Sequence, residues 1–339
     1  MRGKGITYDT GFMNESGGIT RRIFDPRIVQ REMRIIREDL HCNAVRITGG
    51  DADRLETAAL FAAEAGLEVW FCPFTCGLTM DELLSFFATC AERAERLRQQ
   101  GAEVVFLTGS ELSLFNIGFL PGDTLNERFA AIASPDRLRE AMATLPARIN
   151  GFLAKAVKAV RERFGGKVSY ASLPFEGVDW TPFDIISTDA GYRSIEIADR
   201  FRDAIRAFVS QGKPAAVTEF GCTTYRGAAN LGGRGDSIIE WDAEGRPIRL
   251  NRDCIRDEAE QAAYLIELLD IFKNEGIDTV FVNTFARYDL PHRSDTREDF
   301  DKASYGIVKV LEDRTGLTYP DMPWEPKAAF AALADYYRD

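Results

Sequence analysis

VVFLTGSE (residues 104–111) and AAVTEFG (residues 215–221) decide the fold, because each is a short apolar run that ends on a glutamate where a polar loop begins. Apolar runs of about four to eight residues, rich in β-branched and aromatic side chains, are typical of buried strands. Six further runs of this kind lie at 5–10, 43–49, 67–74, 167–176, 184–192 and 278–286. The two quoted runs are therefore expected to be the fourth and seventh strands of eight.

Helical segments with recognisable ends separate most of these runs. Asp25 and Pro26 cap a segment that extends to about residue 40, and Gly66 and Gly101 stop two others, at 51–65 and 80–100. Further segments are predicted at 135–164, 195–210, 257–274 and 323–338. Because strands and helices alternate without a linker, the sequence predicts one (β/α)8 barrel, of the α/β class, over residues 1–339.

An open, doubly wound sheet is the main alternative to the barrel. Such a sheet usually has a glycine-rich phosphate loop after its first strand. Here GGRGD (232–236) follows the seventh strand instead, inside an extended loop over 223–256. The position of this motif favours the barrel.

Composition and charge exclude several classes of function. The 339 residues are 45% hydrophobic and 28% charged, as in ordinary soluble proteins, and the net charge is −11. A negative charge of this size argues against nucleic-acid binding and against binding to anionic membranes. No run has the length of a signal peptide or a membrane span, so we expect a cytoplasmic protein, and the six scattered cysteines are expected to be free thiols.

The carboxyl ends of barrel strands meet at one mouth, so the residues at these ends assemble a candidate site. The polar and aromatic side chains expected there are Tyr8, Asp9, Arg46, Thr48, Phe74, Ser110, Glu111, Glu176, Asp189, Tyr192, Glu219, Asn283, Thr284 and Arg287. Trp241 lies in the loop over 223–256, near the same mouth. The site is therefore expected to be acidic and aromatic.

Two kinds of chemistry have little support. The chain has only two histidines, His41 and His292, and His41 precedes the second strand, at the end of the barrel opposite the mouth. A transition-metal hydrolase normally needs several imidazoles, and a Ser-His-Asp triad needs a well-placed one. No cofactor is expected, although oxygen-only binding of Mg²⁺ by Asp9, Glu176, Asp189 and Glu219 stays open.

Carboxylate chemistry remains. A retaining glycosidase uses one carboxyl group as proton donor and another as nucleophile, about 5–5.5 Å apart. Strands four and seven lie across a barrel from each other, so Glu111 and Glu219 can approach one another over its axis.

In this arrangement the sequence resembles the clan A glycoside hydrolases, the 4/7 superfamily of retaining (β/α)8 enzymes. The resemblance implies that Glu111 in TGSE is the acid/base and Glu219 in TEFG the nucleophile. It further implies that Arg46 in AVRITG and Tyr192 hold the nucleophile, with Arg46 keeping it ionised at neutral pH. WEPKAAFAAL (324–333) is similar to the segment that closes many of these barrels.

The chain departs from the family pattern at two positions. Serine (Ser110) stands before the acid/base, where the family usually has asparagine, and NTFARYD (283–289) lacks the usual strand-eight tryptophan, so Phe285 or Tyr288 would substitute. Candidate sugar-binding residues are Asp9, Arg46, Ser110, Glu176, Asp189, Tyr192, Trp241, Asn283 and Arg287. The expected activity is hydrolysis or transfer of a small oligosaccharide or glycoside; a non-catalytic sugar-binding barrel and a Mg²⁺-dependent barrel enzyme are the alternatives, and the oligomeric state stays open.

Overall fold

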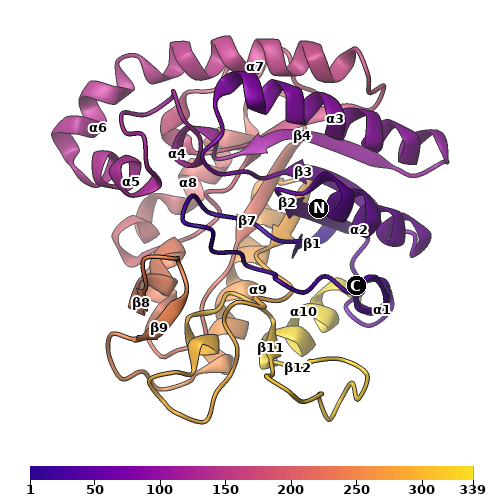
Figure 1. Ribbon diagram of the computed structural model, residues 1–339, viewed down its shortest axis with the longest axis vertical. Helices are drawn as coiled ribbons and strands as arrows, with labels where there is room; N and C mark the ends of the chain where they lie inside the picture. The colour runs from indigo at the N-terminus through magenta and orange to yellow at the C-terminus, as the bar shows by residue number, and fades with distance from the viewer. Residues whose placement is uncertain (339) are drawn as a thin grey trace.

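A closed barrel of eight parallel strands forms the centre of the molecule (Figure 1), in a computed structural model that describes residues 1–338. The strands follow each other around the barrel in the order β1, β2, β3, β4, β5, β6, β7 and β10, and β10 closes the circle against β1. Their bounds are β1 Gly3–Asp9, β2 Ala44–Gly49, β3 Glu68–Pro73, β4 Val104–Ser110, β5 Lys167–Ser172, β6 Ile186–Thr188, β7 Ala215–Phe220 and β10 Thr279–Val282. The predicted (β/α)8 barrel is confirmed.

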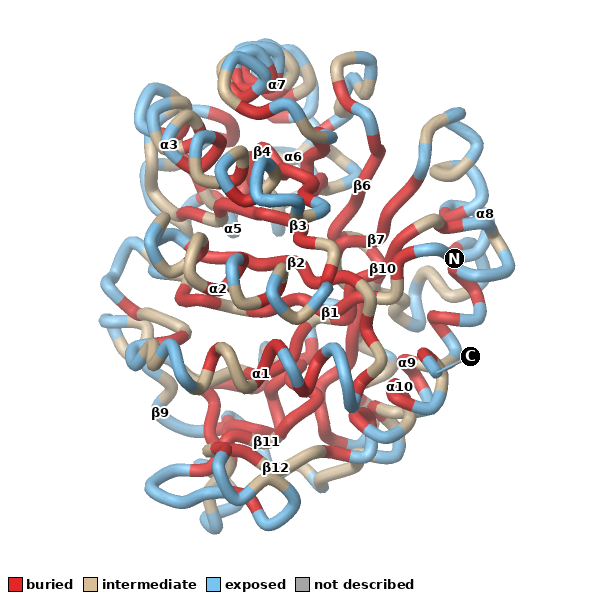
Figure 2. Tube along the Cα trace, turned by 90° about the vertical axis from the view of Figure 1, so that its right-hand side faces the viewer, coloured by how far each residue is buried: buried red, intermediate tan, exposed pale blue. Residues whose placement is uncertain are grey.

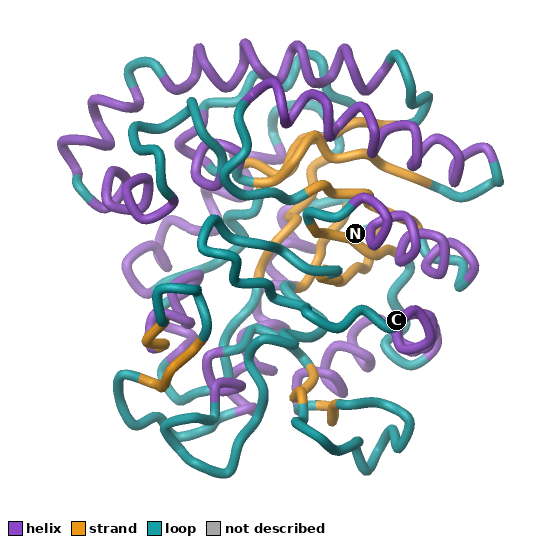
Figure 3. The backbone as a smooth tube through the Cα atoms, in the orientation of Figure 1, coloured by secondary structure: helices purple, strands orange, loops and turns teal. Residues whose placement is uncertain are grey.

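Helices surround the strands on the outside of the barrel (Figure 3). The main ones are α1 Pro26–Glu38, α2 Ala52–Glu64, α3 Met80–Gln99, α7 Leu145–Arg161, α8 Ala198–Val209, α9 Glu258–Glu275 and α10 Ala328–Arg338. Caps explain where two of them begin. The Asp25 carboxylate, in the predicted cap of α1, accepts a hydrogen bond from the Arg27 N–H, and Thr79 and Glu82 form a reciprocal capping box at α3, which was not predicted.

Side chains alternate between two cores, because successive residues of a strand point to opposite faces. One face packs against the helices; the other fills the barrel interior, where Trp70 and Phe281 lie with ring centroids 4.9 Å apart. Both cores are buried, as the strands in Figure 2 show. On β2, Ala44 belongs to the interior set, so Arg46, two residues later, also points into the barrel.

The connection from β4 to β5 is more elaborate than predicted. It contains α4 Leu112–Phe115, α5 Leu125–Ala133 and α6 Pro135–Met142 before α7, so the predicted helix over 135–164 is two helices. Pro146 requires this break, because proline fits only the first turn of a helix. Helix α5 was missed, although Thr124 and Glu127 form a capping box that marks its start.

Three other segments differ from the prediction. The fifth strand, predicted over 167–176, ends at Ser172, and a 3-10 turn at Pro174–Glu176 follows it. The extended loop over 223–256 contains a hairpin of β8 Ile239–Trp241 and β9 Pro247–Leu250. The C-terminal helix begins only at Ala328, because β12 Trp324–Pro326 pairs with β11 Val308–Val310.

The described residues settle two smaller points. All six cysteines are free thiols, as predicted, and four of them are buried. Among residues 1–338, no helix combines the length and the apolar character that crossing a membrane requires.

Candidate active site

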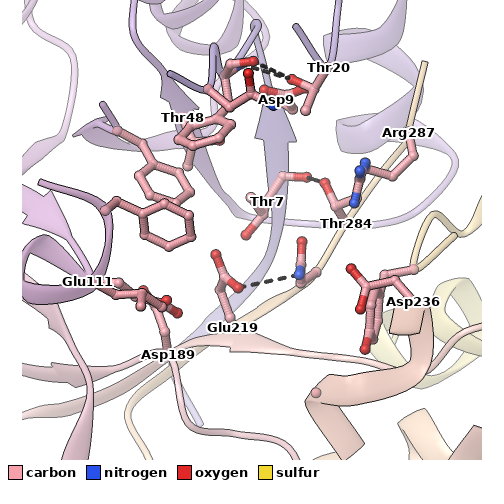
Figure 4. Close-up of a pocket in the computed structure, with 18 of the residues that line it drawn as sticks. Thr7, Asp9, Thr20, Thr48, Glu111, Asp189, Glu219, Asp236, Thr284 and Arg287 are labelled. Carbon is pink, nitrogen blue, oxygen red and sulfur yellow. Dashed lines mark hydrogen bonds between the residues drawn. The ribbon is translucent and has the colours of Figure 1, made fainter. Parts of the chain in front are cut away.

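The carboxyl ends of the strands surround a large cavity of about 2570 Å³. Ten of the residues predicted at the strand ends line it: Asp9, Thr48, Phe74, Glu111, Asp189, Tyr192, Glu219, Asn283, Thr284 and Arg287. Trp241 lines it too, from the β8–β9 hairpin, and is 42% exposed. Glu219 lies near the centre of Figure 4, with Glu111 and Asp189 on one side of it and Arg287 and Asp236 on the other.

An irregularity at the end of β4 sets the position of Glu111. The register between β4 and β5 shifts after Leu107, and Gly109 has a φ of 94°. The shift points Ser110 into the barrel and leaves Glu111 at the mouth, with φ 46° and ψ 42°. Glutamate adopts this left-handed conformation only when its surroundings enforce it, and such residues often belong to functional sites.

Arg46 lies inside the barrel, beneath Glu219, and is completely buried. Its Nη1 atom is 2.8 Å from Glu219 Oε1 and donates a second hydrogen bond, of 3.0 Å, to the Thr218 carbonyl oxygen. Its Nη2 atom donates to Ser110 Oγ over 2.9 Å and lies 3.6 Å from Cys72 Sγ. Strands two, four and seven therefore meet at one guanidinium.

The second oxygen of Glu219 is held by two neutral side chains. Tyr192 donates its hydroxyl hydrogen to Glu219 Oε2 over 3.2 Å, and Asn283 Nδ2 donates to the same oxygen over 3.3 Å. Asn283 also donates to the Tyr192 hydroxyl oxygen over 2.6 Å. Because both carboxylate oxygens have donors, Glu219 has a fixed orientation with a side-chain exposure of 15%.

Glu111 has different surroundings. Among residues 1–338, no group donates a hydrogen bond to its carboxylate, whereas its backbone N–H donates to the Ala171 carbonyl oxygen over 2.9 Å. The backbone of Glu111 is thus fixed while its carboxyl group faces the cavity without a partner.

Burial raises the pKa of both glutamates, to different extents. Burial, with the negative charge of Asp189 adding to it, raises the pKa of Glu219 to about 7, and Arg46 opposes this rise. Burial raises the pKa of Glu111 well above its ordinary value, and the charges of Asp189 and Glu219 add to the effect. Arg46 was expected to keep Glu219 ionised at neutral pH. Asp189 lies beside Arg46 too, and its negative charge weakens the stabilisation of ionised Glu219. The two glutamates titrate as a pair in which Glu111 keeps its proton more readily.

Glu176 does not line the cavity, in contrast to its predicted place at the mouth. It is completely buried, and its carboxylate accepts hydrogen bonds from the Ser113 hydroxyl (2.6 Å), the Tyr170 hydroxyl (2.8 Å) and the Leu173 N–H (2.8 Å). The 3-10 turn after β5 folds the side chain back onto the backbone. A glutamate with these partners is in no position to contact a sugar directly.

Two other predicted residues lie below the cavity floor. Arg46 and Ser110 are buried and are absent from the cavity lining, so they act on the site through Glu219 and Asp189. Arg287 does line the cavity, but its Nε and Nη2 atoms both donate to the Asp289 carboxylate, over 2.9 and 2.7 Å.

Asp9 and two residues that the sequence reading missed complete the polar wall. Asp9 accepts a hydrogen bond from the Gly11 N–H over 2.9 Å, and burial raises its pKa. Asp236 and Asp289 also line the cavity, beside Arg287. Asp236 belongs to GGRGD, which sequence reasoning treated as a loop; only its place after a strand at the mouth hinted at a role.

Within the described part of the chain, no group of three or more histidine, cysteine, aspartate or glutamate side chains has a geometry that would hold a metal ion. His41 lies far from this chemistry, where its Nε2 atom is 3.3 Å from Arg338 Nε.

Comparison with known proteins finds similarity in structure only: no family model matches the chain, and no curated protein matches it. A GH113 β-1,4-mannanase solved as a complex is 19% identical over the whole of both chains, with a TM-score of 0.58. The GH113 β-mannanase AaManA from Alicyclobacillus acidocaldarius, in complex with ManMIm, is 16% identical over 99% of this chain and 97% of its own, with a TM-score of 0.60. A β-glucuronidase from Parabacteroides merdae is 14% identical and has a TM-score of 0.57, but the match covers only 37% of that longer protein.

This chain shares the barrel of the GH113 mannanases. The (β/α)8 fold that the resemblance implied is therefore confirmed. Identities of this size carry the architecture and not the activity.

Proposed function

We propose that this protein is a retaining glycoside hydrolase or transglycosidase that acts on a small oligosaccharide or glycoside. The observation that carries the proposal is the unequal treatment of two glutamates that face one cavity. Glu219 has an arginine and two neutral donors on its carboxylate, whereas among the described residues the Glu111 carboxyl group has none. These are the surroundings that a nucleophile and a proton donor need.

In the first step Glu219 attacks the anomeric carbon, and Glu111 gives its proton to the departing glycosidic oxygen. The products are a glycosyl ester on Glu219 and a free alcohol. Formation of the neutral ester removes a negative charge that helps to keep Glu111 protonated. The pKa of Glu111 therefore falls, and Glu111 is ready to act as base in the second step.

In the second step Glu111 takes a proton from water, or from the hydroxyl group of an acceptor sugar. The oxygen attacks the anomeric carbon, the ester breaks, and the Glu219 carboxylate leaves. Arg46, Tyr192 and Asn283 hold Glu219 in both steps, because they bind its two oxygens at 2.8, 3.2 and 3.3 Å. Hydrolysis and transfer differ only in the acceptor.

The size of the cavity supports a substrate longer than one sugar unit. Its volume of about 2570 Å³ exceeds the roughly 300–1,000 Å³ of a typical small-molecule site. The structural neighbours are described as β-mannanases and β-glucuronidases, so β-mannosides, β-1,4-manno-oligosaccharides and β-glucuronides are the first substrates to test.

The first prediction assigns the two roles by chemical rescue. With a 2,4-dinitrophenyl β-glycoside from this panel, Glu219→Ala and Glu111→Ala should each lose activity. In Glu111→Ala the loss should be roughly 10²–10⁴-fold and should affect the second step, in which water attacks the glycosyl ester. Azide should restore turnover in both variants. It replaces the missing nucleophile in Glu219→Ala and gives an inverted glycosyl azide, whereas in Glu111→Ala it attacks the glycosyl ester and gives a retained one.

The anomeric configuration of the azide, measured by proton NMR, decides the assignment. A retained azide from Glu219→Ala and an inverted azide from Glu111→Ala would mean that Glu111 is the nucleophile and Glu219 the acid/base. Wild-type turnover in either variant would overturn the proposal. Met142→Ala, on α6 and outside the cavity lining, is the control for handling of the variants.

One observation favours a second candidate, a sugar-binding barrel without turnover. The Ser110 hydroxyl donates to Asp189 and lies below the cavity floor, so it cannot contact a sugar hydroxyl as the usual asparagine does. Calorimetric binding of manno-oligosaccharides, with no turnover of any activated glycoside in the panel, would establish this function in place of the first.

A further inference from the structure

Asp189 and Glu219 share a single buried arginine. Arg46 Nη1 lies 2.8 Å from Glu219 Oε1 and 3.4 Å from Asp189 Oδ1, and its Nη2 atom lies 3.4 Å from Asp189 Oδ2. Asp189 Oδ2 also accepts a hydrogen bond of 2.7 Å from Ser110 Oγ. A third carboxylate is thus built into the centre that holds the catalytic pair.

Asp189 is buried more deeply than either glutamate. Its side chain has no exposed area, although the residue borders the cavity, and its Oδ1 atom has no hydrogen-bond partner among residues 1–338. Burial of this kind is costly for a carboxylate unless an opposite charge is close, and Arg46 is that charge. The Arg46 guanidinium must therefore balance the charge of Asp189 as well as that of Glu219.

The groups around Asp189 come from four strands of the barrel and from the loops that follow them. Arg46 approaches from β2, the Cys72 thiol from β3, Ser110 from β4 and Glu111 from just after it, Tyr192 from the loop after β6, and Glu219 from β7. Arg46 is the single cation of this set, against three carboxyl groups. A single guanidinium therefore faces an excess of acidic groups.

We propose that Asp189 is a positioning residue for Glu219: it binds the same guanidinium, and its negative charge limits how far Arg46 can stabilise the Glu219 carboxylate. Asp189 acts through Arg46 and through its own negative charge, and takes no part in bond breaking. The electrostatic effect is a property of the fold, whereas its consequence for turnover rests on the function proposed above.

Physical chemistry gives the direction of the effect. The negative charge of Asp189 disfavours a second negative charge on Glu219 and raises the pKa of that group, in the same direction as burial. Removal of the charge while the shape is kept should therefore lower the pKa of Glu219. Arg46 would then serve one carboxylate in place of two.

Carbon-13 NMR tests the electrostatic effect without any substrate. Protein labelled at the side-chain carboxyl carbon of glutamate is titrated from pH 4 to pH 9, and the Glu219 signal is assigned by its loss in Glu219→Gln. In the wild type we expect its inflection at about pH 7. In Asp189→Asn we expect an inflection lower by about one pH unit or more.

Ser110→Ala is the matched control, because it removes the 2.7 Å hydrogen bond to Asp189 and keeps both charges. Its Glu219 inflection should stay within a few tenths of the wild-type value. An unchanged inflection in Asp189→Asn, or an equal fall in Ser110→Ala, would overturn the proposal. If Asp189→Asn does not fold, Asp189→Ser removes the same charge with a smaller side chain.

Turnover supplies the second arm. If the proposed function holds, the acidic limb of the kcat/KM profile should move down in Asp189→Asn by the same amount as the Glu219 inflection. A moved inflection without any turnover would contradict the glycosidase and leave the role of Asp189 standing. Turnover together with an unmoved Glu219 inflection in Asp189→Asn would support the glycosidase and contradict the role of Asp189.

Discussion

At the residue scale, Glu176 fixes the backbone that follows Glu111. Its Oε1 atom accepts hydrogen bonds from the Ser113 N–H and hydroxyl and from Tyr170, whose own hydroxyl oxygen accepts the Leu112 N–H. Leu112 and Ser113 are the first residues after Glu111, which has a left-handed conformation. The contacts of Glu176 therefore hold the turn that positions Glu111, the proposed proton donor.

Glu176→Ala should consequently affect both stability and rate. Loss of a buried acceptor leaves several donors unsatisfied, which costs about 1–3 kcal/mol of unfolding free energy for each uncompensated group. We expect kcat to fall by roughly tenfold or more while KM changes little, since Glu176 has no place in the cavity lining. Urea denaturation and steady-state kinetics measure the two effects; a rise in KM at unchanged kcat would instead indicate direct substrate contact.

The types of residue at the predicted strand ends indicated where Glu111, Asp189 and Glu219 lie, but not where Glu176 lies. Glu111, Asp189 and Glu219 were found because a parallel barrel brings strand ends together, whatever its loops do. Glu176 was misplaced since a proline-containing turn can fold a glutamate back onto the chain. The sharing of Arg46 depends on the β4 irregularity, which one sequence does not reveal.

At the scale of elements, the β8–β9 hairpin brings an exposed tryptophan to the cavity rim. Trp241 is 42% exposed and lines the cavity. Four phenylalanine side chains, Phe12, Phe74, Phe115 and Phe129, line another part of it in a chain of ring contacts with centroids 4.7–6.4 Å apart. Sugar rings pack their CH groups against such faces, so under the proposed function the hairpin is suited to bind sugar units distant from Glu219.

Trp241→Ala should then raise KM for mannohexaose by roughly threefold to tenfold, because an aromatic contact contributes about 0.5–1.5 kcal/mol. kcat should not change, and neither should the kinetics of a 4-nitrophenyl monoglycoside, which does not extend to the rim. Met142→Ala is the control, since Met142 is 44% exposed and lies outside the cavity lining. Equal effects on the long and the short substrate would contradict this role.

The elements themselves were largely predictable, because caps and periodicity are local signals. The α1, α2 and α3 helices begin and end within a few residues of the positions that their caps predict. The hairpin escaped prediction since Trp241 and its partner residues form only a short, irregular pair. Local signals are weakest where tertiary contacts stabilise a segment, and the mouth loops are such segments.

At the scale of the whole molecule, two populations of carboxyl groups respond to pH in opposite ways. Hydrogen bonds lower the pKa of two surface groups to about 2: Arg98 is the main partner of Glu95, and Ser194 followed by Arg234 are those of Glu196. The contribution of such groups is lost only in strong acid. The buried groups at the barrel mouth, Asp9, Glu111, Glu219 and Asp236, have a raised pKa. Burial at the site thus costs stability at the pH at which the site would work.

The sign of this cost predicts a stability maximum on the acidic side of neutral. Between the ordinary pKa of glutamate, 4.5, and the folded value of about 7, folded Glu219 holds its proton more tightly than the unfolded chain does. The unfolding free energy must therefore fall as pH rises through this range, by an amount on the order of 3 kcal/mol for this group alone.

Guanidinium denaturation should show a more stable protein at pH 5 than at pH 8. Glu219→Gln has no proton to lose, so the difference should shrink by about that amount, and Glu95→Gln should leave it unchanged, since Glu95 titrates below this range. Equal stability at both pH values would mean that the mouth carboxyl groups are better solvated than their burial indicates.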